Sequence, residues 1–282
     1  MQLGKWRLDS VCGGTFRLDG GAMFGIVPKP LWERLQPADQ RNRIRMRANC
    51  VLARDDRHTV LIDTGYGGKH SPRDVEINAL EPGEPLLENL ARLDVAAGDV
   101  DLVVLSHLHF DHVGGASRRE ASGRLVTTFP RAKYFVQRGE WHDATSGVAE
   151  LRGSYLTDDL EPLEACGRLT LIEGDVELID GLSTIATGGH TRGHQAIVLD
   201  SQGQKAIYPA DLCPMTAHVH RLWCMGYDLF PLETRRRKPQ VLGQAADEGW
   251  LVLWDHDPDV VASRLTRDSK RDFAIVEPLT SL

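Results

Sequence analysis

The sequence has no long apolar run and no segment typical of export, and both absences narrow the class of protein. No apolar stretch approaches the roughly 18 residues that are needed to span a bilayer, so no membrane-spanning segment is expected. The N-terminal residues lack a basic segment followed by an apolar one, so no signal peptide is predicted. We therefore expect a cytoplasmic protein that does not act on a membrane.

Cysteine is scarce, and its spacing excludes two kinds of site. The five cysteines are odd in number and far apart, and none forms a Cys-x-x-Cys pair. Neither a thiolate zinc site nor a disulfide framework is therefore expected. Buried, reduced thiols are the simplest interpretation, and they agree with the predicted cytoplasmic location.

An excess of positive charge is also missing. Lys and Arg number 33 against 40 Asp and Glu, which gives a formal net charge of −7. An acidic protein repels phosphate backbones, so nucleic acid is not an expected partner. The one basic cluster, residues 235–238, is short, and we interpret it as the solvent-exposed face of a helix.

The residues that are present indicate one globular α/β domain over residues 1–282, because composition is average and repeats and linkers are absent. In the first half, hydrophobic patterning predicts a helix over 84–94, another near 139, and strands at 59–63, 101–105 and 133–137. From residue 169 onward the sequence predicts mostly strands, at 169–172, 176–179, 184–187, 194–200, 205–210 and 249–254.

Three of these strands end in side chains that can carry chemistry. His107 follows the strand at 101–105, Asp211 follows the strand at 205–210, and His256 follows the strand at 249–254. Proteins with α/β folds place their chemistry where strand ends converge on one rim. We therefore expect these three side chains to lie close together.

The most informative stretch is Ser-His-Leu-His-Phe-Asp-His-Val-Gly-Gly at residues 106–115. It places His107, His109, Asp111 and His112 within six residues, directly after a strand. Neutral imidazoles and carboxylates are the ligands that zinc accepts where thiolates are absent. Four such groups in one tight loop suit two metal ions about 3.5–4 Å apart better than one, and burying them without a cation would be costly.

Two metal ions need more ligands than this loop supplies, and the candidates are His190, Asp211 and His256. The order His-x-His-x-Asp-His, Gly-His-Thr-x-Gly-His, a strand-terminal Asp and a late His resembles the metallo-β-lactamase superfamily over roughly residues 45–260. The turn Asp63-Thr64-Gly65 is similar to a further motif of that family. The resemblance implies a four-layer αββα sandwich with two divalent metal ions, zinc being expected.

The same resemblance implies a role for each of these residues. The implied ligands are His107, His109 and His190 for one ion, Asp111, His112 and His256 for the other, and Asp211 as a bridge between them. His194 would lie behind the ligands, and Asp63 would orient a ligand imidazole. Redox di-iron members usually carry Glu where this chain has His109, so the resemblance favours hydrolysis.

Charge arithmetic agrees with hydrolysis. Two dications, two aspartates and one hydroxide sum to about +1 if the histidines are neutral, and this residual charge favours an anionic tetrahedral transition state. Two metal ions would also lower the pKa of a bridging water towards about 7. A hydroxide nucleophile would then form at neutral pH without a serine or a cysteine.

Four segments resemble the lactonase-like branch of the superfamily, particularly the YtnP-type quorum-quenching lactonases. They are residues 20–32, Glu140-Trp141-His142, residues 214–218 and Tyr227-Asp228. We therefore expect a dinuclear zinc hydrolase that opens lactones, with acyl-homoserine lactones as one class of substrate. An apolar cleft for an acyl tail is predicted from Met23, Phe24, Phe110, Trp141, Trp223 and Phe230.

The chain departs from the lactonase pattern at Pro214. Several acyl-homoserine lactonases carry a tyrosine three residues after the bridging aspartate, where it contacts the substrate carbonyl. In this chain the catalytic groups would be Asp111 and Asp211, and the oxyanion would rely on the metal ions alone or on a donor such as His218 or Tyr227.

Other functions and the assembly stay open at this point. The same metal site supports phosphotriester or aryl-ester hydrolysis, and a more distant alternative is an iron-dependent oxidoreductase or a metal-binding protein without activity. The expected partner is a small molecule with an apolar tail. The sequence does not determine the oligomeric state, and a homodimer is one alternative.

Overall fold

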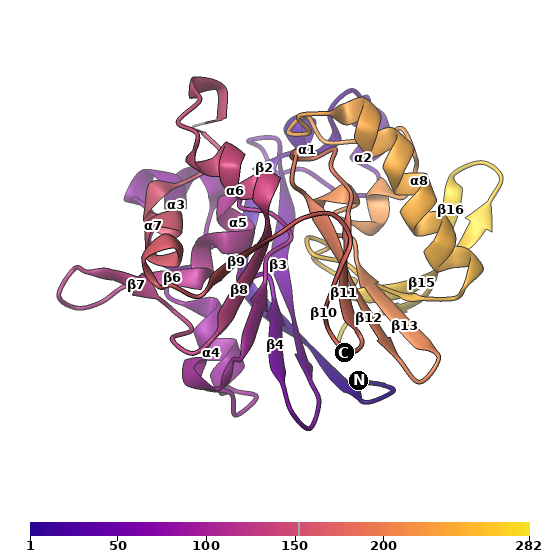
Figure 1. Ribbon diagram of the computed structural model, residues 1–282. Helices are drawn as coiled ribbons and strands as arrows, with labels where there is room; N and C mark the ends of the chain where they lie inside the picture. Colours follow the sequence, from indigo (N-terminus) through magenta and orange to yellow (C-terminus); the bar gives the residue numbers. More distant parts are fainter. Residues whose placement is uncertain (152) are drawn as a thin grey trace.

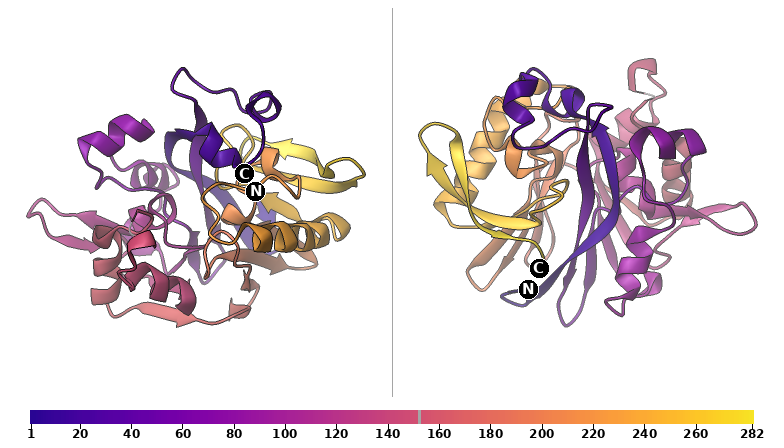
Figure 2. Two further views of the ribbon diagram at one scale, coloured as in Figure 1. Left: turned by 90° about the horizontal axis from the view of Figure 1, so that it is seen from above. Right: turned by 180° about the vertical axis from the view of Figure 1, so that it is seen from behind.

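Two β-sheets pack face to face in the computed structural model, which describes residues 1–151 and 153–282, and helices cover the outer face of each sheet (Figure 1). This arrangement confirms the predicted four-layer αββα sandwich. The view from behind in Figure 2 shows the same layers, with the two chain ends close together at one edge of the sandwich.

The first sheet joins a long antiparallel hairpin to a parallel half. Its strands, in order across the sheet, are β1 (Gln2–Leu3), β2 (Trp6–Asp19), β3 (Arg43–Arg54), β4 (Thr59–Ile62), β5 (Leu102–Val104), β8 (Lys133–Gln137) and β9 (Leu169–Ile172). Strands β1 to β4 pair antiparallel, whereas β4, β5, β8 and β9 run parallel. The carboxyl ends of these parallel strands therefore meet at one edge.

The second sheet is antiparallel except at one pair. Its strands, in order, are β10 (Val176–Ile179), β11 (Leu182–Ala186), β12 (Gln195–Ser201), β13 (Gln204–Tyr208), β14 (Leu251–Leu253), β15 (Ala262–Asp268) and β16 (Asp272–Leu279). Strands β13 and β14 are the parallel pair, and α8 (Pro231–Asp247) lies between them in the chain. Parallel neighbours need such a crossover, and their carboxyl ends point the same way.

Helices and short elements fill the outer layers and the open end. On the side of the first sheet lie α3 (Pro72–Asn78), α4 (Pro85–Ala91), α5 (Phe110–Val113), α6 (Arg138–Thr145), α7 (Thr157–Ala165) and the hairpin of β6 (Ser117–Arg119) and β7 (Leu125–Thr127). Helix α8 covers the second sheet, and α1 (Gly20–Phe24) and α2 (Lys29–Trp32) lie at the upper end in Figure 1. The 3-10 turns are η1 (Ala97–Asp99), η2 (Gly114–Ala116), η3 (Ala149–Leu151), η4 (Ala210–Leu212) and η5 (Thr216–His218).

Alternation along the strands divides the core into layers. Val60 and Ile62 of β4, and Val104 of β5, pack between the two sheets, where they meet side chains of β12, β13 and β14. Leu61 and Val103 point to the opposite face and belong to a second core cluster, which includes side chains of α4 and α7. Successive side chains of a strand point to opposite faces, so fully buried strands can be apolar throughout.

The elements predicted from hydrophobic patterning are confirmed with small shifts at their ends. The helix expected over 84–94 is α4, and the strands expected after residue 169 are β9 to β14. The prediction of mostly strands in this part of the chain is confirmed, and α8, a helix of 17 residues that contains the basic cluster, lies among these strands. Four basic residues and Pro239 occupy its first half, so it lacks an extended apolar stripe.

The basic cluster at residues 235–238 does lie on a helix, but it is not wholly exposed. Lys238 of α8 is 1% exposed, and its Nζ donates to the carbonyl oxygens of His218 and Trp223 at 2.9 and 2.5 Å. The interpretation as a solvent-exposed face is therefore wrong for Lys238. Its ammonium group attaches the loop before α8 to the helix.

Two findings bear on the absences noted in the sequence. All five cysteines are free thiols. Among the described residues, no helix combines the length and the apolar character that crossing a bilayer would take.

A buried ion pair joins the turn after β4 to α7. Lys69 and Asp159 have side chains that are 4% and 3% exposed, and Lys69 Nζ lies 2.9 Å from Asp159 Oδ1. Lys69 also donates to the carbonyl oxygens of Gly114 and Ser117, in the segment that follows α5. One ammonium group therefore connects three segments of the first layer.

The substitution Lys69→Met should lower the free energy of unfolding by about 3–5 kcal/mol, because the Asp159 carboxylate stays buried without a partner. Adding Asp159→Leu should recover a large part of that loss, since apolar groups then replace the whole pair. Unfolding in urea measures both effects. As a control, Lys205→Met removes a surface ammonium 3.5 Å from Asp200 and should cost less than about 1 kcal/mol. Equal losses for the two lysines would contradict the prediction.

Candidate metal centre

Hydrogen bonds and close backbone packing hold the loop after β5 against the turn after β4. Ser106 donates its N–H and its hydroxyl to Asp63 at 2.7 and 2.6 Å. Thr64 donates its N–H and its hydroxyl to the carbonyl oxygen of His112, both at 2.7 Å. A Cβ at Gly115 would lie 2.1 Å from the Thr64 carbonyl oxygen, so only glycine allows this approach. These contacts fix the loop that carries the first four predicted ligands.

The other three predicted ligands come from the edge of the second sheet. His190 lies in the turn between β11 and β12, Asp211 lies in η4 after β13, and His256 follows β14. Because β13 and β14 are parallel, Asp211 and His256 emerge side by side and face the loop after β5. The structure thus brings all seven predicted ligands to one end of the sandwich.

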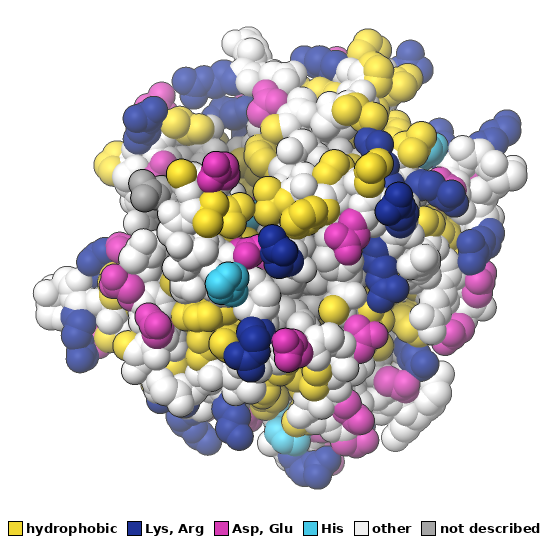
Figure 3. Space-filling view, turned by 45° about the horizontal axis from the view of Figure 1, so that its top comes forward, with side chains coloured by type: hydrophobic (Ala, Val, Ile, Leu, Met, Phe, Trp, Pro, Cys, Tyr) yellow, Lys and Arg dark blue, Asp and Glu magenta, His cyan; other side chains and the backbone are white. Residues whose placement is uncertain are grey.

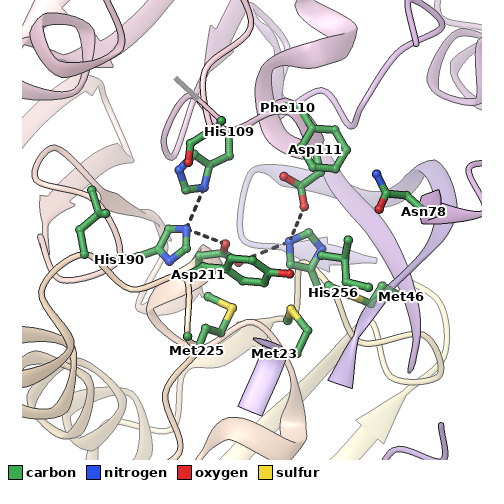
Figure 4. A pocket seen from close by; sticks show the side chains of 16 residues that line it. Met23, Met46, Asn78, His109, Phe110, Asp111, His190, Asp211, Met225 and His256 are labelled. Atoms are coloured by element: carbon green, nitrogen blue, oxygen red, sulfur yellow. Dashed lines mark hydrogen bonds and ion pairs between the residues drawn. The ribbon is translucent and has the colours of Figure 1, made fainter. Parts of the chain in front are cut away.

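One group of ligand atoms is formed by His107, His109, His190 and Asp211, and these atoms lie within 4.8 Å of one another. His190 Nε2 is 3.0 Å from Asp211 Oδ2 and 2.9 Å from His109 Nδ1 (Figure 4). His107 Nε2 is 3.7 Å from Asp211 Oδ2 and has no hydrogen-bond partner among the described residues. These are the four residues that the resemblance assigns to the first ion.

A second group consists of His112, Asp211, Asp255 and His256, again within 4.8 Å of one another. His256 Nε2 lies 3.1 Å from His112 Nε2 and 3.3 Å from Asp211 Oδ1. Asp111, an expected ligand, places Oδ2 3.5 Å from His256 Nε2 (Figure 4). Asp211 is common to both groups, as expected for a bridging carboxylate, whereas Asp255 was not predicted.

The donor set fits two divalent ions. Imidazole nitrogens face each other at 2.9 Å in one group and 3.1 Å in the other, and at most one proton can lie between each pair. Bonds of about 2.0–2.1 Å to a shared zinc ion place ligand nitrogens at comparable separations. A cation in each group would therefore satisfy lone pairs that are otherwise buried against one another.

Burial and charge set the protonation of the ligand imidazoles. Burial, reinforced by the neighbouring histidines, lowers the pKa of His107 and His109 well below the usual range. Burial also acts on His190, but the carboxylates of Asp211 and Asp228 outweigh it and raise the pKa of His190 to about 10. A metal ion must displace a proton from His190, so acid should oppose metal binding.

Two carboxylates contact ligand imidazoles on the nitrogen that points away from the ions. Asp63 Oδ2 lies 2.8 Å from His112 Nδ1, which is the geometry expected for Asp63. Asp228 Oδ1 lies 2.9 Å from His190 Nδ1 in the same way. Each contact fixes the imidazole so that Nε2 faces the ion. Sequence reasoning missed the role of Asp228, because 38 positions separate it from His190 and no local motif joins them.

Glu140 of α6 holds two ligand segments together. Its buried carboxylate accepts from the Leu108 N–H at 3.0 Å, the Thr191 hydroxyl at 2.5 Å and the Tyr155 hydroxyl at 3.1 Å. Leu108 lies between two ligand histidines, and Thr191 directly follows a third. One carboxylate thereby sets the distance between both parts of the first ligand group. The sequence analysis named Glu140 only within a segment that resembles lactonases and did not predict that it joins two ligand segments.

A cavity of about 360 Å³ opens onto the ligands. Its polar side is formed by His109, Asp111, His190, Asp211 and His256. Its apolar side is formed by Leu18, Met23, Met46, Phe110, Met225 and Leu229, with Tyr227 beside them. Figure 4 shows Met23 and Met225 across Asp211 from His109. Figure 3 shows many hydrophobic side chains at the surface of this end of the molecule.

Of the six residues predicted to form the cleft, only Met23 and Phe110 line this cavity. Phe24 is fully buried in a stack of rings between Trp32 and His218, with centroid distances of 5.2 and 4.5 Å. Trp223 packs edge-on against the same ring. These aromatic residues therefore belong to a hydrophobic cluster, with Trp223 partly buried at its edge, because stacked rings bury large areas together.

The same stack corrects the expectation for His218 as an oxyanion donor. Its ring lies parallel to Phe24, and its Nε2 lies 2.9 Å from the carbonyl oxygen of Met23. Burial, with the nearby Lys238 ammonium, lowers the pKa of His218 to about 3. His218 is therefore a neutral core residue and does not line the cavity.

The remaining predicted residues divide between core, rim and cavity. Trp141 packs against the core beside the first sheet, and the Phe230 ring lies under the Arg192 guanidinium at 5.8 Å, so neither lines the cavity. Tyr227 does line it. His194 lies outside both ligand groups, with its ring 5.3 Å from that of His107, which matches the position expected for it.

Comparison with known proteins agrees with this geometry. Residues 43–231 match the model of the metallo-beta-lactamase superfamily. An N-acyl homoserine lactonase of Bacillus cereus is 25% identical over 163 residues, which cover 54% of this chain and 58% of that enzyme. The chain therefore spans little more than half the length of this relative.

Solved structures extend the likeness over 98% of the chain. A probable metal-dependent hydrolase from Staphylococcus aureus superposes with a TM-score of 0.91 at 30% identity and covers 98% of both chains. AidC, a dizinc quorum-quenching lactonase, superposes with a TM-score of 0.80 at 19% identity over 98% of this chain and 95% of its own, a likeness in fold. The family match, the two ligand groups and the shared sandwich fold agree with one another. This chain therefore belongs to the metallo-β-lactamase superfamily.

Proposed function

We propose that this protein is a two-metal hydrolase that opens lactones with an apolar acyl tail, with N-acyl-homoserine lactones as the principal class. The observation that carries the proposal is the sharing of Asp211 by two ligand groups at one side of a cavity whose other side is apolar. The Bacillus cereus relative is an N-acyl homoserine lactonase, and AidC was crystallised with a homoserine product, which supports the substrate class.

The metal ligands take the roles that the resemblance implies. In this proposal His107, His109 and His190 would hold one ion, Asp111, His112 and His256 would hold the other, and both would share Asp211. We propose zinc for both positions, because imidazoles and carboxylates without thiolates suit it. When bound, such ions supply a Lewis acid for a carbonyl oxygen and lower the pKa of a coordinated water. Because the ligands come from both sheets, we propose that the chain acts as a single domain.

Tyr227 is the proposed donor to the ester carbonyl. Pro214 offers no hydroxyl at the position where several lactonases carry tyrosine, whereas Tyr227 reaches the cavity from the loop before α8. Burial, together with the charges of Asp111 and Asp19, raises the pKa of Tyr227 to about 12. The phenol therefore keeps its proton at neutral pH and can donate to an oxygen that becomes negative.

The apolar side of the cavity is the proposed site of the acyl tail. Met23, Met46 and Met225 contribute thioether side chains to it, and Leu18 and Leu229 extend it. Tyr227 and Leu229 are 41% and 40% exposed, so the wall continues towards solvent. A tail that lies along this wall would leave its lactone carbonyl between Tyr227 and the ligands.

The substitution Asp211→Asn should remove the bridge and release metal. We expect kcat/KM to fall by at least a hundredfold, which corresponds to about 2.7 kcal/mol of transition-state stabilisation. Plasma mass spectrometry measures ions per chain, and a lactone assay measures turnover. Asp200→Asn, which changes an exposed aspartate on β12, is the matched control and should leave both unchanged. An Asp211→Asn protein with two bound ions and full turnover would show that the bridge is misassigned.

The substitution Tyr227→Phe should leave both ions bound and lower kcat/KM by roughly a hundredfold, because one donor to the developing oxyanion is lost. The pKa of Tyr227 near 12 also means that the hydroxyl is intact below it. The wild-type rate should therefore show no alkaline decline from this group up to about pH 10. A Tyr227→Phe enzyme with unchanged kcat/KM would assign the oxyanion to the ions alone.

Acyl chains of eight or more carbons should give a kcat/KM at least about tenfold above that of a four-carbon chain, because each buried methylene contributes up to about 0.8 kcal/mol. Ring opening releases a proton, so a weakly buffered indicator follows the reaction directly. Aryl esters and a phosphotriester should be assayed beside the lactones at equal metal loading. If only the phosphotriester turns over, phosphotriester hydrolysis replaces lactone opening as the proposed activity.

A further inference from the structure

Asp255 is a buried carboxylate that the roles described so far do not use. It is 1% exposed, and neither of its carboxylate oxygens has a hydrogen-bond partner in residues 1–151 or 153–282. Asp257, two residues further on and 2% exposed, accepts from the N–H and the hydroxyl of Thr216 and from two further backbone N–H groups. A carboxylate buried without a donor is unfavourable unless a cation meets it.

The neighbours of Asp255 are metal ligands. One of its oxygens belongs, with atoms of His112, Asp211 and His256, to a set that lies within 4.8 Å. Asp255 Oδ2 is 3.5 Å from His256 Nε2. Asp111 comes equally close to that nitrogen, but Asp111 lines the cavity and Asp255 does not. The two carboxylates therefore approach this position from different sides.

Asp255 differs from Asp63 and Asp228, the carboxylates that orient ligand imidazoles, in the nitrogen atom that it faces. Those residues contact Nδ1, on the side of the imidazole that points away from the ions. In His256, Nδ1 already lies 3.0 Å from the carbonyl oxygen of Arg47. Asp255 lies instead near Nε2, the nitrogen that faces His112 and Asp211. A carboxylate on that side can meet the ion itself.

We propose that Asp255 is a further metal ligand at the His112/His256 position, additional to the seven residues that the resemblance implies. The inference rests on the two-metal centre of the proposed function and does not depend on its substrate. With Asp255 included, this position has three carboxylates and two imidazoles, whereas the other has three imidazoles and one shared carboxylate. The third carboxylate brings the formal charge of the loaded centre from about +1 to about zero.

The test compares the metal affinity of wild-type protein with that of Asp255→Asn, which removes the charge at nearly constant size. Metal-free samples are titrated with Co²⁺ while the visible d–d bands are recorded. Zinc per chain is measured by plasma mass spectrometry after dialysis against increasing chelator. We expect Asp255→Asn to bind one ion as wild type does and the other at least about tenfold more weakly. The d–d bands of that second ion should change in position and intensity, because its coordination changes.

Asp257→Asn is the matched control, because it alters a buried carboxylate nearby that belongs to neither ligand group. It should lower the melting temperature and leave the Co²⁺ spectrum and both affinities as in wild type. Metal-free Asp255→Asn should be about as stable as wild type, because the buried carboxyl group that it replaces has no hydrogen-bond partner among the described residues. Asp255→Ala provides a second variant for the same titration.

Two results would overturn the proposal. One is an Asp255→Asn protein with both affinities and both Co²⁺ spectra unchanged, which would mean that the buried carboxyl group is neutral and binds no ion. The other is a weakened affinity with unchanged spectra, which is the result expected of a supporting residue. The titration needs no substrate, so lactones that stay inert in the presence of two ions would overturn only the proposed substrate. A wild-type protein that binds a single ion would overturn both proposals.

Discussion

The structure depends on holding imidazole and carboxylate groups against one another where little water reaches them. Nitrogen atoms that face each other at 2.9 and 3.1 Å share at most one proton, so each pair leaves further ligand atoms of its group without a partner until a cation binds. The chain must therefore supply this arrangement before a metal ion stabilises it. It does so with backbone contacts around Ser106 and Thr64, with a glycine at 115, and with a Glu140 carboxylate that binds two segments at once.

The metal ligands could be predicted from the sequence, because their spacing and their places at strand ends already indicate that they lie together. Four ligands lie within six residues after a strand, and the other three lie at strand ends or in a turn, which a single sequence displays directly. The residues around them are different. Asp228 meets His190, 38 positions away, only in the folded chain, and although Asp255 adjoins His256 in the sequence, no period or motif marks it as a buried carboxylate. The burial of Lys238 in α8 escaped prediction for a related reason, because it depends on carbonyl groups of another segment that accept hydrogen bonds from its ammonium group.

The apolar wall shows why residue type alone does not separate a binding surface from the core. Met23 and Phe24 are neighbours in the same short helix, yet one lines the cavity and the other is stacked between Trp32 and His218. Stacking buries large ring areas, so Phe24 belongs to the core, whereas Phe110 and Tyr227 line the cavity. The side chains left at its surface are mainly aliphatic and thioether groups, which the sequence analysis had not emphasised.

The methionines on that wall carry a consequence for the range of ligands. Methionine is unbranched, has three rotatable bonds and has a polarisable sulfur, so it adapts to irregular shapes with little strain. A surface built from Met23, Met46 and Met225 can mould itself to straight, branched or aromatic acyl groups. The affinity for the acyl tail would then depend on the apolar area that the tail buries and only weakly on its shape. The metal ligands are held rigidly, so the reactive group must fit a fixed geometry. The cavity thus combines an adaptable apolar side with a rigid side formed by the metal ligands.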